Sequence, residues 1–249
     1  MGAGHDSHFI ARLAWDAVAR RVAAGSPAIL PIGAAAKQHG FHLPLDTDRR
    51  QAEWFAAEIA ERIDALIWPT VTYGYYPAFV EYPGSTSLSS STFEAVIHEI
   101  ATGILDAGCT TLFVLNTGIS TEAPVERALI RLDTWKVHHL RAYGGPRYIS
   151  AAETLSRQSH GSHADELETS LMLAIAPDMV DMARAEASPA MVHEVPGRLT
   201  PTDARSPNFS RSGSYGDPTL ATTAKGEVLL TALLDDLHEQ AAAAMDASR

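Results

Sequence analysis

Two imidazoles and two carboxylates stand close together in the segment from Lys37 to Asp48. The segment reads Lys-Gln-His-Gly-Phe-His-Leu-Pro-Leu-Asp-Thr-Asp, and its four candidate ligands are His39, His42, Asp46 and Asp48. Imidazole nitrogen and carboxylate oxygen together suit zinc, manganese or iron. Gly40 and Pro44 favour an irregular backbone that can aim several side chains at one point. These residues therefore predict a metal-binding loop, with a helix start that carries surface histidines as the alternative.

The elements on either side of this segment place it at the end of a strand. Residues 28–33 are a short apolar run bounded by Pro27 and Gly33, which is typical of a fully buried strand. Apolar residues at helical spacing then predict a helix over 52–63, with Thr47 or Asp48 as its cap. The segment thus follows a strand and leads into a helix.

The next elements repeat this alternation. Residues 65–71 suggest a second strand, and Ser91 with Glu94 predicts a capping box for a helix that ends at Gly108. Residues 111–115 form the next predicted strand. Strand, helix, strand, helix is typical of an α/β fold with three layers and a mainly parallel sheet, in which ligands bind beyond the carboxyl ends of the strands. Both 37–48 and 116–121 follow such ends.

A helix is also predicted from Ile10 until Gly25 and Pro27 stop it, and further helices are predicted at 124–132, 164–176 and 228–245, while 195–218 is interpreted as a long loop. No element is assigned between 132 and 164. His163 directly precedes one of these helices. The tyrosines of the segment after the second strand suggest an aromatic wall for a planar substrate or, equally, a hydrophobic interface; they are Tyr73, Tyr75, Tyr76 and Tyr82.

Composition narrows the class of protein. A chain of 249 residues with 46% hydrophobic and 20% charged residues is compatible with one domain over 1–249. The formal charge of −11 argues against nucleic acid or an anionic membrane as a partner. The single cysteine, Cys109, excludes an internal disulfide and reads as a core thiol. Neither a signal peptide nor a membrane-spanning run is apparent, so we expect a cytoplasmic protein with a small-molecule substrate.

Five segments resemble, in order and spacing, motifs of the creatininase (creatinine amidohydrolase) family. The first is similar to the family motif Glu-Gln-His-Gly-x-His-Leu-Pro-x-x-Thr-Asp. The resemblance covers about residues 28–235, and its segments are 37–48, 82–88, 114–121, 163–170 and 215–226. It implies a creatininase-like three-layer fold, a homo-oligomer that is often hexameric, and a pair of divalent metals that activates a water for attack on an amide.

Carried over by position, the resemblance assigns one metal to His39, Asp48 and Glu168, and an acid/base role to His163. The second metal needs a glutamate and a histidine, but this chain has Lys37 and Gly118 at those positions. The two ions of a dinuclear site lie only about 3.5–4 Å apart. The ammonium of Lys37, if it reaches into that space, would repel a second divalent ion. We therefore expect one divalent metal (Zn, Mn or Fe) and an ion pair between Lys37 and Asp48.

The predicted function is hydrolysis of an amide or related C–N bond in a non-peptide small molecule. The catalytic residues are His163, Lys37 and Asp48, and the metal ligands are His39, Asp48 and Glu168. Two alternatives stay open. A metal-free site would use Lys37, Asp48 and His163 as a lyase, cyclase or isomerase. A catalytically silent homologue is the other.

Overall fold

A parallel sheet of four strands forms the centre of the molecule. The computed structural model describes residues 7–132, 135–189 and 197–247. Its strands are β1 (Ala28–Ile32), β2 (Leu66–Ile67), β3 (Leu112–Asn116) and β4 (Val137–Arg141), in the order β2-β1-β3-β4. All pairs are parallel, and β1 is central, paired from Ala28 to Ile32 with β3. Parallel pairing requires crossover connections, which the helices between the strands provide.

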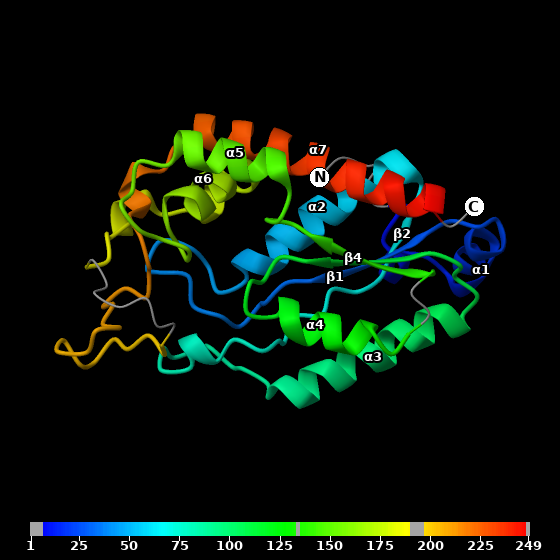
Figure 1. Cartoon of the computed structure of the whole chain (residues 1–249), viewed down its shortest axis with the longest axis horizontal. Coiled ribbons are helices and arrows are strands. Elements are labelled where there is room, and N and C mark those ends of the chain that lie inside the picture. Colours follow the sequence, from blue (N-terminus) through cyan, green and yellow to red (C-terminus); the bar gives the residue numbers. More distant parts are fainter. Residues whose placement is uncertain (1–6, 133–134, 190–196, 248–249) are drawn as a thin grey trace.

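Helices cover both faces of the sheet, which gives the predicted three-layer α/β/α fold (Figure 1). One face carries α2 (Thr47–Ile63) and α7 (Thr223–Ala247), and α7 also packs against α5 (Pro146–Leu155) and α6 (Glu166–Ile175). The other face carries α3 (Ser90–Asp106) and α4 (Glu122–Leu129). The remaining α-helix, α1 (Trp15–Ala23), lies at one end of the sheet in Figure 1.

Each strand of the central pair sends alternate side chains into two separate cores. Ile29 and Phe113 pack in the core under α2 and α7, whereas Leu30 and Val114 pack in the core under α3. All five positions of β1 and of β3 are buried. A strand that is buried on both faces reads as a continuous apolar run, and this is the pattern that predicted β1 and β3.

Several boundaries differ from the predictions. The first helix begins at Trp15, because Ile10–Arg12 forms a separate turn of 3₁₀-helix. The second strand is only Leu66–Ile67, with one further bridge at Val71. The predicted helix 164–176 is α6, and 228–245 is the interior of the longer α7.

Both predicted helix caps were wrong. The N-cap of α2 is Asp46, so Thr47 and Asp48 already lie in the first turn. The N-cap of α3 is Ser89, whose Oγ accepts a hydrogen bond from the backbone N–H of Thr92. Helix periodicity locates a helix but leaves its first residue uncertain by a turn, because several polar residues near its start are able to cap it.

The structure adds two elements that were not predicted, β4 and α5. The long loop is confirmed for residues 197–217, which contain no helix or strand; residues 195 and 196 lie outside the described residues. No helix in the described part of the chain is long and apolar enough to cross a membrane.

Candidate active site

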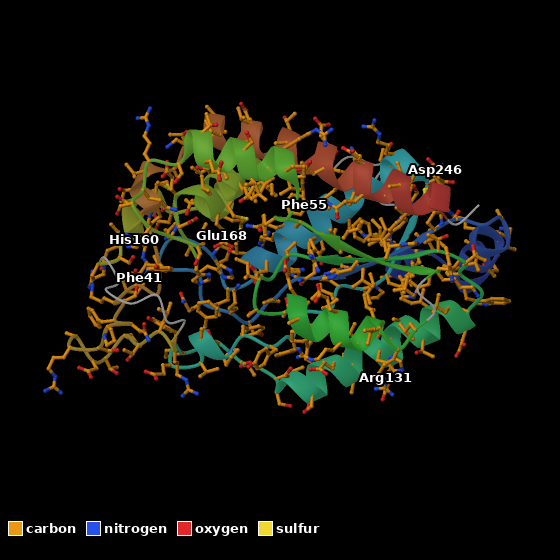
Figure 2. The ribbon with its side chains drawn as sticks, in the orientation of Figure 1. Phe41, Phe55, Arg131, His160, Glu168 and Asp246 are labelled. Carbon is orange, nitrogen blue, oxygen red and sulfur yellow. The ribbon has the colours of Figure 1, made fainter. Side chains whose placement is uncertain are left out.

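The carboxyl end of β1 and the start of α6 bring the candidate residues together. Lys37, His39 and Asp48 come from the segment between β1 and the first turn of α2. His163 and Glu168 come from the start of α6, which packs against α2. In Figure 2, Glu168 lies between α6 and the start of α2. All five residues are buried or largely buried, and they form one cluster.

His39 faces acceptors with both of its ring nitrogens. Its Nδ1 lies 2.9 Å from the carbonyl oxygen of Lys37, and since a carbonyl only accepts, this nitrogen carries a proton. Its Nε2 lies 2.9 Å from Oδ1 of Asp48 and 3.7 Å from Oε1 of Glu168. A cation therefore belongs between Nε2 and these carboxylates, either a proton on His39 or a metal ion.

The predicted ion pair of Lys37 with Asp48 is present. The Lys37 Nζ lies 2.7 Å from Oδ2 of Asp48, and the side chains are only 9% and 4% exposed. Burial opposes ionisation of Asp48, but the charges of Lys37 and His39 outweigh it and hold the pKa of this carboxyl well below its usual range. The Lys37 Nζ also lies 5.2 Å from the ring centre of Phe79, within cation–π distance.

Glu168 is aimed by the backbone at the start of α6. Asp165 caps this helix, because its Oδ1 accepts the backbone N–H groups of Leu167 and Glu168. The Oε2 of Glu168 accepts the backbone N–H of Ala164 at 2.6 Å. Ala164 has a φ of +46°, a strained backbone of the kind that clusters at functional sites. Burial raises the pKa of Glu168 despite the nearby positive charges.

His163 presents one lone pair to the cluster. Its Nε2 donates to the carbonyl oxygen of Gln38 at 2.8 Å, so in the neutral ring Nδ1 is the unprotonated nitrogen. That Nδ1 lies 3.8 Å from Oε2 of Glu168. Burial, with the charges of Lys37 and His39, lowers the pKa of His163 well below its ordinary value. The ring packs against that of Phe79 at a centroid distance of 4.2 Å, which holds it in place.

The donor set fits one metal ion. One ligand atom each from His39, His163 and Glu168 lie within 4.8 Å of one another, and Asp48 adds an oxygen on the His39 side. Metal–nitrogen and metal–oxygen bonds of about 2.0–2.2 Å place two ligands of one tetrahedral ion roughly 3.4 Å apart. Three of the spacings, 2.9 Å from His39 to Asp48, 3.7 Å from His39 to Glu168 and 3.8 Å from His163 to Glu168, bracket that value, while the set of His39, His163 and Glu168 spreads up to 4.8 Å. Thus His163 is also within reach of a ligand role.

The chain's own side chains fill the position that the resemblance implies for a second metal. A cavity of only about 10 Å³, room for a single water, lies behind the Lys37–Asp48 pair and is lined in part by Asn116 and Gly118. Thr121 fills the space beside Gly118: a Cβ on that glycine would lie 2.5 Å from the Thr121 Oγ1. This hydroxyl donates to Oδ1 of Asn116 at 2.7 Å, which closes the loop on itself. The residues here therefore do not fit a second ion.

A larger pocket opens on the other side of the cluster. It has a volume of about 550 Å³ and is lined by Lys37, Asp48, His163 and Glu168 together with apolar and aromatic side chains. That size is within the range of small-molecule sites. The reactive groups are thus accessible from a pocket large enough for a substrate.

The other polar residues of the first segment have structural roles. The Nε2 of His42 lies 2.8 Å from Oγ1 of Thr169, and burial with the nearby His39 lowers the pKa of His42 to about 4. Asp46 pairs with Arg49 and Arg50 on α2. These contacts fasten the segment to α2 and α6, and they leave His39 and Asp48 for chemistry.

The four predicted tyrosines do not line the main pocket. That pocket is lined by Phe79, Tyr143 and Tyr148, whereas Tyr76 lines the small cavity. The alternative, a hydrophobic interface, stays a prediction. Tyr73 is 53% exposed, and Tyr82 donates its hydroxyl to the Ser210 carbonyl. Tyr143 and Tyr148 were missed because β4 and α5 were not recognised. The signal available was a tyrosine directly after a strand end.

The chain is similar to known proteins over most of its length. The family model described as creatinine amidohydrolase matches residues 11–241. A creatinine amidohydrolase of Pseudomonas putida is 29% identical over 246 residues, covering 90% of this chain and 92% of the relative. A mycofactocin precursor peptide peptidase of Mycolicibacterium smegmatis is 28% identical, covering 83% and 81%. A solved structure named "Creatininase Mn" superposes with a TM-score of 0.80 at 26% identity, covering 93% and 96%.

The fold and the site are those of a class of enzymes that have an α/β fold and hydrolyse C–N bonds. Members of this class include amidohydrolases and a peptidase. Within it, the chain belongs to the creatininase family, because the family model covers nearly its whole length. The predicted family and the predicted creatininase-like fold are thereby confirmed.

Proposed function

We propose that this protein hydrolyses an amide or related C–N bond of a small molecule at a site with one divalent metal. His39, Asp48 and Glu168 hold the metal, His163 transfers protons, and Lys37 replaces the positive charge of a second ion. By name, one relative acts on a small molecule, creatinine, and another acts on a precursor peptide. The pocket volume of about 550 Å³ supports the smaller kind of substrate.

The observation that carries the proposal is the convergence of acceptors around His39. With Nδ1 held by the Lys37 carbonyl, Nε2 has a lone pair that faces the oxygens of Asp48 and Glu168. A metal ion satisfies all three atoms without forcing a charged imidazole into a buried site. A divalent ion, when bound, supplies the charge that makes water acidic enough to attack at neutral pH.

The chain's own residues divide the remaining work. His163 is neutral because its pKa is depressed by burial and nearby positive charge, so its Nδ1 accepts the proton of the attacking water. The same low pKa makes the protonated ring a good acid toward the leaving nitrogen. Lys37 lines the pocket, and the N–H groups that Asp48 leaves free donate to the carbonyl oxygen as negative charge develops there.

Metal content tests the proposal first. We expect one equivalent of zinc, manganese or iron per chain by elemental analysis after purification, and hydrolysis that chelation abolishes. In Asp48→Asn both the metal and the activity are expected to be lost, since the ligand charge is removed. Asp46→Asn is the matched control, because Asp46 belongs to the same segment but pairs with Arg49 and Arg50 outside the pocket.

The outcomes separate the candidate functions. A folded wild-type chain that binds no divalent metal would sink the hydrolase proposal. It would favour metal-free chemistry by Lys37, Asp48 and His163, because a proton on His39 satisfies the same acceptors. Absence of both metal and turnover would indicate a catalytically silent homologue. We further propose that the chains form a homo-oligomer, which native mass measurement tests.

A further inference from the structure

Two tyrosines line the main pocket, and their hydroxyls differ. Tyr143 follows β4 and Tyr148 lies in the first turn of α5; their ring centroids are 5.4 Å apart at an angle of 50°. Tyr143 donates its hydroxyl to Oε1 of Gln51, so that group is already used. The hydroxyl of Tyr148 makes no hydrogen bond to any residue in 7–132, 135–189 or 197–247. A polar group on a pocket wall without a protein partner is available to a ligand.

The rest of the wall around Tyr148 is apolar and flat. Ala152 lies one turn further along α5, and Leu167 and Leu171 of α6 also line the pocket. Phe79, from the 3₁₀-helix Pro77–Phe79, adds a further aromatic face, fixed by its contact with His163. Aromatic and aliphatic side chains of this kind bind a planar ring by stacking and by excluding water.

Charge on this side of the pocket discriminates between ligands. Asp165 and Glu168 line it. Burial contributes most to the raised pKa of Tyr148, and the negative charges of Asp165 and Glu168 raise it further. The only lysine on the pocket, Lys37, is paired with Asp48. The wall near Tyr148 therefore disfavours an anionic ligand.

We propose that Tyr148 is a specificity-determining residue and that the substrate is an uncharged aromatic amide. The ring of the amide would lie against Tyr143 and accept a hydrogen bond from the Tyr148 hydroxyl. The amide carbon would then face Lys37, Asp48 and Glu168, which line the same pocket. The amide part of this inference rests on the proposed function, whereas the ring preference of the pocket does not.

Binding of three probe amides tests the ring preference without requiring turnover. The probes are nicotinamide, whose flat ring carries an acceptor nitrogen, cyclohexanecarboxamide, which has no flat ring, and the anion 4-carbamoylbenzoate. Isothermal titration of the purified protein is expected to show nicotinamide binding roughly 2- to 10-fold more tightly than cyclohexanecarboxamide, which is the scale of one aromatic pair. The anion is expected to bind weakest.

Tyr148→Phe keeps the ring and removes only the hydroxyl, so its fold is expected to be intact. It should weaken nicotinamide roughly 2- to 10-fold, the scale of one hydrogen bond, and leave cyclohexanecarboxamide unchanged. Tyr148→Leu also removes the hydroxyl and should weaken nicotinamide at least as much as Tyr148→Phe does. Tyr73→Phe is the matched control, since Tyr73 is exposed outside both pockets.

Equal binding of nicotinamide and cyclohexanecarboxamide, or unchanged nicotinamide binding in both Tyr148 variants, would overturn the inference. Hydrolysis assays on the same samples keep the two proposals apart. Ring preference without hydrolysis of any amide would support the tyrosine wall and count against the proposed function. Hydrolysis without ring preference would do the reverse.

Discussion

At the scale of single residues, Lys37 and His39 share the two oxygens of Asp48. One oxygen lies 2.7 Å from the Lys37 ammonium, and the other lies 2.9 Å from Nε2 of His39. The ammonium is part of the chain, so the positive charge at this oxygen cannot dissociate. We propose above that this charge takes the place of a second metal ion.

Replacement of Lys37 tests whether its ammonium takes the place of a second metal ion. Lys37→Glu would place a second carboxylate beside Asp48, and two buried like charges bind a cation strongly. We expect titration calorimetry to show a second, weaker divalent ion in K37E, and no second ion in Lys37→Gln. The second ion is expected to be weak because Thr121 still fills the space beside Gly118. A stoichiometry of one ion in folded K37E would contradict this interpretation.

His139 is a residue whose burial makes the folded state less stable at low pH. It lies on β4, and neither ring nitrogen has a hydrogen-bond partner within the described chain. Burial lowers its pKa to about 4. The unfolded chain therefore binds a proton near pH 6.5 while the folded chain does not, so the stability contributed by neutral His139 is lost as pH falls from about 6.5 to about 4.

We expect the free energy of unfolding to fall by about 3 kcal/mol between pH 7 and pH 4 through this group. His139→Leu should remove most of that difference in urea titrations at the two pH values. His160→Gln is the control, because its ring is partly exposed and has hydroxyl neighbours. An unchanged pH dependence in folded H139L would show that the histidine is hydrated or paired in solution.

At the scale of elements, the start of α6 positions the site because it carries His163 and Glu168. A buried ion pair holds this turn: Lys225 of α7 pairs with Oε1 of Glu166, which is completely buried. The other oxygen of Glu166 accepts the backbone N–H groups of Arg157 and Gln158, each at 2.8 Å. One carboxylate thus joins α7, α6 and the segment after α5.

Lys225→Met would leave Glu166 charged and unpaired in the interior. Loss of one partner of such a pair costs about 3–5 kcal/mol, and we expect that loss in urea unfolding. Glu166→Gln combined with Lys225→Met should cost less than the two single changes summed, because neither charge is then left alone. Lys136→Met is the control at an exposed lysine. A cost below about 1 kcal/mol for K225M would show that the pair does not stabilise the fold.

At the scale of the whole molecule, the parallel sheet and its crossovers decide where the active site lies. The segments that follow β1 and β3, and Tyr143 after β4, all line the pocket. The start of α6, which packs against α2, also lines the pocket. A metal bound there would tie the first segment of the chain to α6.

Metal removal should therefore lower the stability of the whole fold. A ligand that binds only the folded state at 100 times its Kd stabilises by about 2.7 kcal/mol. For a chain of this size that corresponds to a decrease in Tm of roughly 5–10 °C after chelation. Added metal should restore the Tm of the wild type but not that of Asp48→Asn. If chelation leaves the Tm of a metal-containing sample unchanged, the metal does not link the segment 37–48 to α6.

The sequence by itself determined the helices and strands with strong patterns, and it placed Lys37, His39 and Asp48 together because they are neighbours in the chain. It also indicated the ion pair of Lys37 with Asp48. β4 was missed because Val137-His138-His139-Leu140-Arg141 has no alternation of apolar and polar residues, and α5 was missed with it. A buried histidine resembles an exposed one in a pattern of hydrophobicity.

Only the tertiary structure decided which distant residues meet. His163 lies 125 positions from Gln38, yet the two are hydrogen-bonded, and the aromatic wall belongs to Tyr143 and Tyr148 instead of the tyrosines nearer the first motif. The physical reason is that local periodicity sets an element's type and buried face, whereas pairing of strands and packing of helices set the neighbours across the sheet.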